Sequence, residues 1–240
     1  MRFLTASIPM ASALVLCSCN GVGVNMEPSG PIKTDHNVVE LDKAEIVNTK
    51  FQMGAGEMHV QGGSAKLMEG DFSYAIPSWK PDITYSSTGF RGSLTIAQPS
   101  KSKGLNANSD GYKWEVKLND KVAQDLEFVV GVGVTKMDLS TINIRSLDVK
   151  MGVGEMEINL RGKPQKDYSV QIKGGVGEAK IMLPKDIGVI ATASGGLGGV
   201  DTTGMTKEGN QYVNEAYKKS PVTIRLTIEG GVGGIKLLCE

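Results

Sequence analysis

The sequence predicts an all-β fold, a stacked β-ribbon solenoid of the single-stranded β-helix type. A Gly-x-Gly motif recurs six times, and the first glycines at 131, 152, 175 and 196 are 21, 23 and 21 residues apart. Apolar and polar residues alternate around these motifs, and glycine is frequent, 31 of 240 residues. Near-equal periods of this length are typical of stacked repeats, in which each unit contacts its neighbours.

The six Gly-x-Gly motifs are interpreted as corners at which the chain turns. Only glycine adopts positive φ without steric cost, so we expect such a residue in every corner. The corner glycines are Gly54, Gly56, Gly131, Gly133, Gly152, Gly154, Gly175, Gly177, Gly196, Gly198, Gly231 and Gly233. We expect these corners to lie in one column, with successive turns of the backbone on top of each other.

The residues around each corner are predicted to be strands with one buried face. Positions four, six and eight after the first glycine are apolar in 14 of 18 cases, and the interleaved positions are polar in ten of 12. This alternation is the period of a half-buried strand. One unit cannot bury its apolar face alone, but stacking at about 4.8 Å joins the faces into a core. No stretch has a convincing helical period; residues 212–218 are too few.

A non-repeating insert separates the first corner from the second, whose first glycines are Gly54 and Gly131. It contains strand-like runs at residues 65–74, 82–86, 92–98 and 112–119, and a polar loop at 99–111. The runs predict either extra sheet made of degenerate coils or a separate N-terminal β subdomain. Trp79 lies between two of them and is interpreted as a core anchor rather than a ligand contact.

The N-terminus predicts export and lipid attachment. Arg2 precedes a short apolar run that ends Leu16-Cys17-Ser18-Cys19, the pattern of a signal peptide with a lipobox. Cys19 fits as the lipidated residue because Ser18 is small, whereas Leu16 before Cys17 is not; the alternative is a secreted protein with an accidental cysteine. Acyl chains on Cys19 would hold the protein on a membrane.

These features divide the chain into four predicted parts. Residues 1–18 are the signal peptide, and residues 19–37 a Gly-, Pro- and polar-rich lipidated tether. Residues 38–130 form an N-terminal β region with the insert, and residues 131–240 the C-terminal repeat solenoid. The expected location is the bacterial cell envelope, at the outer membrane or cell surface.

Several separated motifs resemble those of the bacterial toast-rack lipoproteins. They are the Gly-Ala-Gly-Glu type of corner, Glu69-Gly70-Asp71-Phe72, Trp79-Lys80-Pro81-Asp82-Ile83-Thr84-Tyr85 and Tyr212-Val213-Asn214-Glu215-Ala216-Tyr217. The resemblance covers about residues 38–240. It implies an all-β stacked-ribbon fold with no enzymatic role. A related C-terminal domain in membrane proteins of envelope stress responses implies a protein- or peptide-binding role. The last two corners depart from the pattern, since Gly199 and Gly234 replace glutamate.

Composition and motif spacing argue against several ligand classes. Lys+Arg and Asp+Glu are balanced at 26 each, so the basic face needed for nucleic acid is not indicated. The corners lack the third glycine and the following helix of a dinucleotide site. They also lack the nine-residue spacing of a calcium β-roll. We therefore expect no nucleic acid, no nucleotide, no metal and no other cofactor.

An enzyme is a weaker alternative. Glu155 and Glu178 follow consecutive corners and would stack as a carboxylate pair, which could act as acid and base in a hydrolase or simply be solvated. The two histidines have structural interpretations: His36 in the tether and His59 on an outward strand face. Cys239 occupies an inward position and is interpreted as a buried hydrophobe, not a reactive thiol.

Two non-catalytic functions therefore remain. The first is an envelope lipoprotein that binds or senses a protein or peptide partner through its ordered polar surface. The second is a structural or adhesin-like module that self-associates through its sheet edges. The final coil, which ends at Leu238-Cys239-Glu240, is a candidate open edge.

Overall fold

The computed structural model describes residues 30–99 and 111–240, and almost all of its regular structure is strand. Thirteen strands belong to one sheet, and a short 3-10 turn, η1 (Pro77–Trp79), is the only helical element in the described ranges. The short strands are β1 (Lys33–Val39), β3 (Met68–Tyr74), β4 (Asp82–Thr88), β5 (Arg91–Ala97), β6 (Lys113–Asn119), β11 (Met205–Glu208) and β12 (Gln211–Asn214). The all-β prediction is confirmed.

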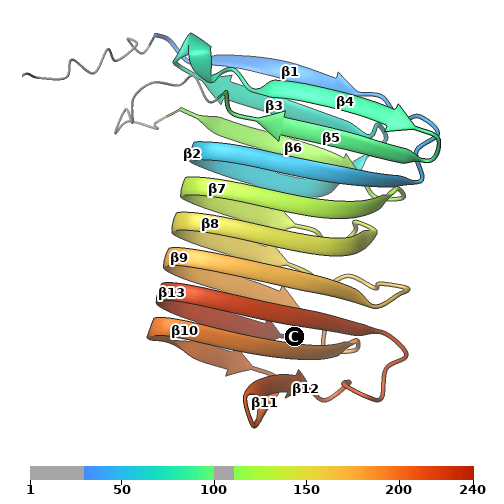
Figure 1. The fold of residues 1–240 in the computed structure, drawn as a ribbon, viewed down its shortest axis with the longest axis vertical. Coiled ribbons are helices and arrows are strands. Elements are labelled where there is room, and N and C mark those ends of the chain that lie inside the picture. Colours follow the sequence, from blue (N-terminus) through green and yellow to red (C-terminus); the bar gives the residue numbers. More distant parts are fainter. Residues whose placement is uncertain (1–29, 100–110) are drawn as a thin grey trace, which may run out of the picture.

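Six long strands form the body of the molecule, and each bends once at its Gly-x-Gly corner (Figure 1). They are β2 (Ile46–Ser64), β7 (Ala123–Asp138), β8 (Ile144–Asn159), β9 (Tyr168–Leu183), β10 (Gly188–Thr203) and β13 (Thr223–Cys239). We call the part before the corner the first arm and the part after it the second arm. First arms pair in parallel in one layer and second arms in the other, so the apolar side chains of both meet in between.

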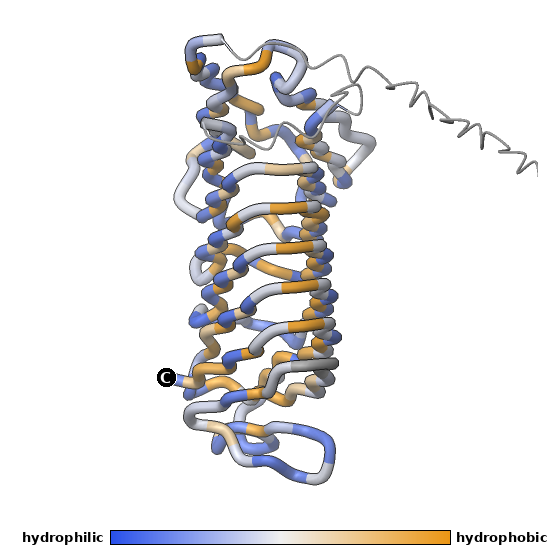
Figure 2. Tube along the Cα trace, turned by 90° about the vertical axis from the view of Figure 1, so that its left-hand side faces the viewer, coloured by the Kyte–Doolittle hydropathy of each residue, from blue (hydrophilic) through white to orange (hydrophobic). Residues whose placement is uncertain are grey.

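The corners lie one above another, as expected, and Figure 2 looks directly onto them. The second glycine of every corner has φ between 137° and 148°, a conformation that residues with a side chain rarely adopt. The first glycines of four corners have a different constraint. A Cβ on any of them would collide with the carbonyl oxygen of the corner on the neighbouring strand: Gly131, Gly152, Gly175 and Gly231.

The long strands do not stack in chain order. The sheet order β2-β7-β8-β9-β13-β10 places the C-terminal strand β13 between β9 and β10. The expectation that the last residues of the chain form an open edge is therefore wrong. Side-chain size explains the exchange: β13 contributes large core residues such as Leu226 and Ile228, whereas β10 contributes small ones such as Ala191. An interior place buries the larger side chains from both sides.

The insert forms further layers of the same stack. β5 pairs in parallel with the first arm of β2, and β6 pairs in parallel with its second arm. Together these two short strands take the place of one bent strand. Then β4 and β3 continue the two layers, and β1 pairs outside β3. Of the two alternatives, extra coils are correct and a separate subdomain is not.

Two expected boundaries fall inside strands. The tether was expected to extend to residue 37, but β1 already begins at Lys33, because it pairs with β3 over its whole length. A boundary between residues 130 and 131 would cut β7 at its corner, and one hydrophobic core runs from Ala44 to Cys239 across it. The lipid-attachment residue Cys19 and the signal peptide lie outside the described residues.

Candidate functional site

In-register pairing turns the outward residues of the second arms into straight rows that cross the whole sheet. Neighbours in a row are about 4.8 Å apart, so each charge acts on the next. One row crosses nine strands and contains acidic, basic and histidine side chains. It contains His36, Asp71, Glu115, His59, Lys136, Glu157, Lys180, Lys236 and Asp201.

This face is hollowed into a groove of about 810 Å³, which we call the charged groove. Its walls come from β1, β3, β6, β2, β7, β8 and β9, so residues from 36 to 182 converge on it. Its ionisable lining residues are Glu69, Asp71, Glu115, Asp138, Glu157, Lys117, Lys136, Arg161, His36 and His59. A concave surface with converging polar groups is the usual form of a binding site.

The carboxylates of the charged groove already have partners within the protein. Asp71 Oδ1 lies 2.8 Å from His36 Nδ1, and Glu115 Oε1 lies 2.7 Å from the Lys113 Nζ. The Asn159 amide donates to Asp138 Oδ1 over 3.0 Å. The hydrogen bond to Glu115 raises the pKa of Lys113. The acidic side of the groove is therefore largely compensated.

Two lysines of the charged groove, unlike its carboxylates, have no side-chain partner in the described part of the chain. Within residues 30–99 and 111–240, neither Lys117 nor Lys136 has an ion-pair or hydrogen-bond partner for its side chain. They flank β2 from opposite sides: Lys117 pairs in register with Gln61, and Lys136 with His59. The groove thus presents two lysines without an ion pair in these ranges on either side of one strand, each in register with a glutamate on its other side, Glu69 beside Lys117 and Glu157 beside Lys136.

Both histidines line this groove, although only one was placed correctly from the sequence. His59 lies on an outward strand face, as predicted, with Nε2 2.7 Å from Glu57 Oε1. His36 lies in β1 rather than in the tether. Sequence reasoning missed their proximity because β3 and β6 lie between their strands and pair with them over long sequence separations. Residues 33–39, Lys-Thr-Asp-His-Asn-Val-Val, show no alternation of apolar and polar side chains that could have predicted β1.

Glu155 and Glu178 do stack on neighbouring strands, as predicted. Both are exposed, and Lys236 Nζ lies 2.7 Å from Glu178 Oε1, a contact that raises the pKa of Lys236. One carboxylate of the pair is therefore compensated by a cation, and neither is sheltered from water. This is the geometry of solvated surface groups rather than of an acid and base pair, in which environment separates the two pKa values.

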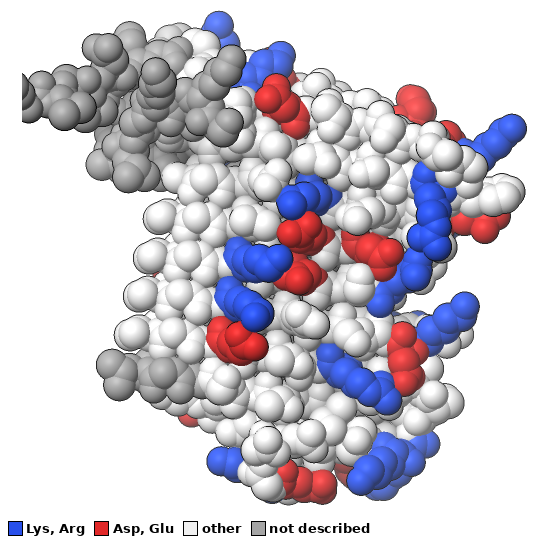
Figure 3. Space-filling model, viewed as in Figure 1, with Lys and Arg blue, Asp and Glu red and all other residues white. Residues whose placement is uncertain are grey.

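The outer face of the first arms carries charges that pair across strands. Figure 3 shows positive and negative side chains interleaved over the middle of this face, with a run of positive side chains toward the side away from the bends. Lys50 Nζ lies 3.2 Å from Glu127, and Lys173 Nζ lies 3.1 Å from Glu229. Exposed pairs of this kind contribute little stability, and they leave this face without a net charge to attract a partner.

Two further predicted residues have structural roles. Trp79 is 5% exposed and packs edge-on against Tyr112 with ring centroids 5.1 Å apart, and Tyr112 donates its hydroxyl hydrogen to the Trp79 carbonyl. Trp79 is thus the core anchor that the sequence predicted. Cys239 is 7% exposed, and burial raises the pKa of its thiol. The prediction of a buried, unreactive cysteine agrees with this environment.

In the described ranges, no cluster of three or more His, Cys, Asp or Glu side chains could hold a metal ion. Nor does any helix there have the length and apolar composition to cross a membrane.

A stack of bent strands with an ordered polar face on each layer defines a β-solenoid. Residues 28–182 match the N-terminal domain of toast_rack, DUF2154, over more than half of the chain. The chain therefore belongs to the toast-rack family, which confirms the resemblance seen in the motifs. Residues 132–237 also match the C-terminal domain of LiaF, a family described as cell wall-active antibiotics response.

A solved structure has the same architecture. A candidate cell adhesion protein from Clostridium sporogenes ATCC 15579 is 38% identical, with a TM-score of 0.84, over 87% of this chain and all of that one. A candidate adhesin from Bacteroides fragilis NCTC 9343 is 15% identical over 88% of this chain and 98% of its own, with a TM-score of 0.38. That second likeness is too distant to carry an argument. No curated protein matches the chain.

Proposed function

We propose that the protein is a non-catalytic envelope lipoprotein, anchored through Cys19, that binds a protein or peptide partner in its charged groove. The family to which it belongs, the LiaF-type match and the adhesion-related solved structure all support an envelope role. The lipobox supports the anchor. No catalytic constellation competes with this function on the groove surface.

The observation that carries the binding role is the pair of groove lysines that form no ion pair within the described residues. A partner that places carboxylates over Lys117 and Lys136 would gain two ion pairs without first breaking any within the protein. The surrounding rows offer further hydrogen-bonding groups at a constant spacing. We therefore infer a partner segment with acidic side chains that crosses the groove over β2.

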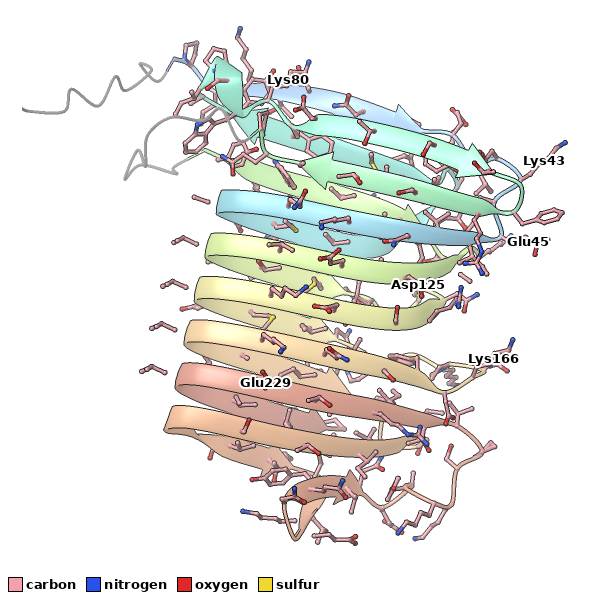
Figure 4. The ribbon with its side chains drawn as sticks, in the orientation of Figure 1. Lys43, Glu45, Lys80, Asp125, Lys166 and Glu229 are labelled. Atoms are coloured by element: carbon pink, nitrogen blue, oxygen red, sulfur yellow. The ribbon has the colours of Figure 1, made fainter. Side chains whose placement is uncertain are left out.

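Site-specific photo-crosslinking in intact cells tests this function. A photoreactive residue at Gln61, which lies between the two lysines, should give a discrete adduct, while one at exposed Lys166, on the β8–β9 loop labelled in Figure 4, should not. Adding Lys117→Glu and Lys136→Glu should abolish the adduct. Equal adducts at both positions, or an adduct indifferent to charge reversal, would refute the groove as the binding surface.

A separate experiment tests lipid attachment at Cys19. Metabolic labelling with a fatty acid should give a lipidated protein, and Cys19→Ser should remove the label and release the protein from the membrane fraction. Cys17→Ser is the matched control and should change neither. Loss of label in the Cys17 variant instead would move the attachment point.

A second candidate function is self-association through a sheet edge. The candidate cell adhesion protein favours it, and so does one edge: β10 pairs with β12 only through residues 190–192. Its second arm has no strand beyond it among the described residues. Sedimentation over a range of concentrations tests this function, because a strict monomer at high concentration excludes it.

A further inference from the structure

The middle residue of every Gly-x-Gly corner is apolar in the sequence, and in β7, β8, β9 and β13 it lies exposed at the outside of the bend. These residues are Ala55, Val132, Val153, Val176, Leu197 and Val232. The four valines are 46–50% exposed. They are in register on four neighbouring strands, β7, β8, β9 and β13. We call this column the valine ridge.

The fold does not require valine at this position. The backbone constraints fall on the flanking glycines, and the middle side chain points away from the core. Stacking of β-branched side chains in a column accounts for the half of each valine that is covered. The other half faces water, and the bend margin of the molecule carries no charge in Figure 3. Contiguous exposed apolar surface of this kind marks an interaction site.

Opposite charges flank the ridge at its two central strands. Lys150 and Lys173 lie two residues before the corners of β8 and β9, on the outer face of the first arms. Glu155 and Glu178 follow the same corners, on the outer face of the second arms. All four are exposed. At β8 and β9 the ridge thus has lysines on one side and glutamates on the other. Three of these four charges also form ion pairs within the chain: Lys150 with Glu127, Lys173 with Glu229 at 3.1 Å, and Glu178 with Lys236 at 2.7 Å.

This asymmetry selects one way of placing two ridges together. A two-fold axis parallel to the stack sets the positive side of one copy against the negative side of the other, at the same strand level. A two-fold axis perpendicular to the two strand layers would instead set like charges together, which costs binding free energy. The first arrangement is isologous, so each pairing occurs twice.

We propose that two copies of this chain associate side by side, with parallel stacks, through their valine ridges. Lys150 and Lys173 of each copy then face Glu155 and Glu178 of the other. Figure 4 shows the side chains of this margin projecting outward from the bends, free of any neighbouring element. The surface differs from both the charged groove and the sheet edges, so this dimer requires neither of them, but its pairing on a membrane rests on the proposed anchor at Cys19.

The dimer suits a membrane-anchored protein. Parallel stacks place both N-terminal ends on the same side, so both copies can be attached to one membrane. The ridge is one side chain wide and therefore smaller than the roughly 800 Å² per partner of a standard stable interface. We expect weak association in dilute solution and appreciable pairing where anchoring raises the effective concentration.

Disulfide crosslinking of the full chain in membrane vesicles tests the proposal. In the parallel dimer every valine faces its own counterpart, so Val132→Cys, Val153→Cys and Val232→Cys should each crosslink to themselves. In an antiparallel pair, Val132 would face Val232, and only mixed variants would crosslink. Gln171→Cys, exposed on the first arm of β9, is the control and should give about a tenth of the yield or less.

Charge exchange supplies a second test. Lys150→Glu with Lys173→Glu should lower the Val153→Cys crosslink about tenfold. Adding Glu155→Lys and Glu178→Lys should restore it, which a merely misfolded protein would not do. Ridge crosslinking no higher than the Gln171 control, or unchanged by charge reversal, would overturn the dimer. Adducts at Gln61 in the groove should persist in every ridge variant, so the two proposals fail separately.

Discussion

Replacing Gly154 with alanine should destabilise the protein severely, because two independent constraints meet at that residue. Its φ is +138°, where a side chain is strained. A Cβ would also collide with the carbonyl oxygen of Gly133 on the neighbouring strand and lie 2.8 Å from Met151 Cε. Contacts under 3.0 Å to backbone essentially never occur, so the two strands would have to separate at the corner.

The size of the effect follows from these two constraints. The strained conformation costs about 1–3 kcal/mol, and insertion of an atom into a packed site costs about 1–3 kcal/mol more. Their sum, about 2–6 kcal/mol, is a large part of the roughly 5–15 kcal/mol that stabilises a typical protein. For a chain of this length it lowers the Tm by roughly 4–24 °C.

Two matched variants separate the constraints. Gly152 has the close contact, with the carbonyl oxygen of Gly131, but no positive φ, so Gly152→Ala should cost only about 1–3 kcal/mol. Gly174 has neither, and nothing lies within 4 Å of its Cβ position. Gly174→Ala should leave stability unchanged or raise it by about 0.4–1 kcal/mol.

The assay is thermal and urea unfolding of the purified chain, followed by circular dichroism. The expected order of stability is Gly174→Ala, then wild type, Gly152→Ala and Gly154→Ala. If Gly154→Ala is as stable as wild type, the corner does not need glycine and the explanation given for the column is wrong. If Gly174→Ala lowers the stability as much as Gly154→Ala does, the loss of stability does not depend on the geometry of the corner.

Three further outcomes are expected. Asn119→Ala should cost about 2–4 kcal/mol in urea unfolding, because the buried Asn119 side chain hydrogen-bonds four backbone groups, whereas exposed Asn143→Ala should cost little. The Thr223 N–H and then Arg225 lower the pKa of Asp167 below 3.8, so its stabilisation is present above pH 3.8 and lost as pH falls further. Urea midpoints of Asp167→Asn and wild type should therefore differ at pH 6 and converge in acid; a constant difference contradicts the linkage. Cys239 should react with a thiol reagent only at the rate of unfolding, and rapid labelling of the folded chain would contradict its burial.

Local periodicity determined the repeating part of this fold. Alternation around each corner predicted which side chains are inward, and residues such as Met156, Ile158 and Leu160 are indeed 4% exposed or less. The glycines predicted where each strand bends. These signals are sufficient because both depend on residues that are close together in the sequence. A strand alternates with a period of two, and a bend between stacked strands has no room for a Cβ at its two glycine positions.

Local signals of this kind cannot predict the order in which the long strands pair in the sheet. Every repeat has the same pattern, so the pattern fits β13 in any place in the stack; packing placed it between β9 and β10, where its large side chains are buried on both sides. The pairing of β5 and β6 as one split layer depends likewise on contacts between distant residues.

The sequence alone therefore determined the fold class, the corners and the inward faces of the long strands. The tertiary structure alone decided the neighbours of each strand, and with them every row on the surface. The charged groove brings His36 and Lys136 to one face because intervening strands pair between them. The valine ridge likewise becomes continuous only when four corners align. Both surfaces arise from register between strands distant in sequence, whereas the strands themselves arise from adjacent residues.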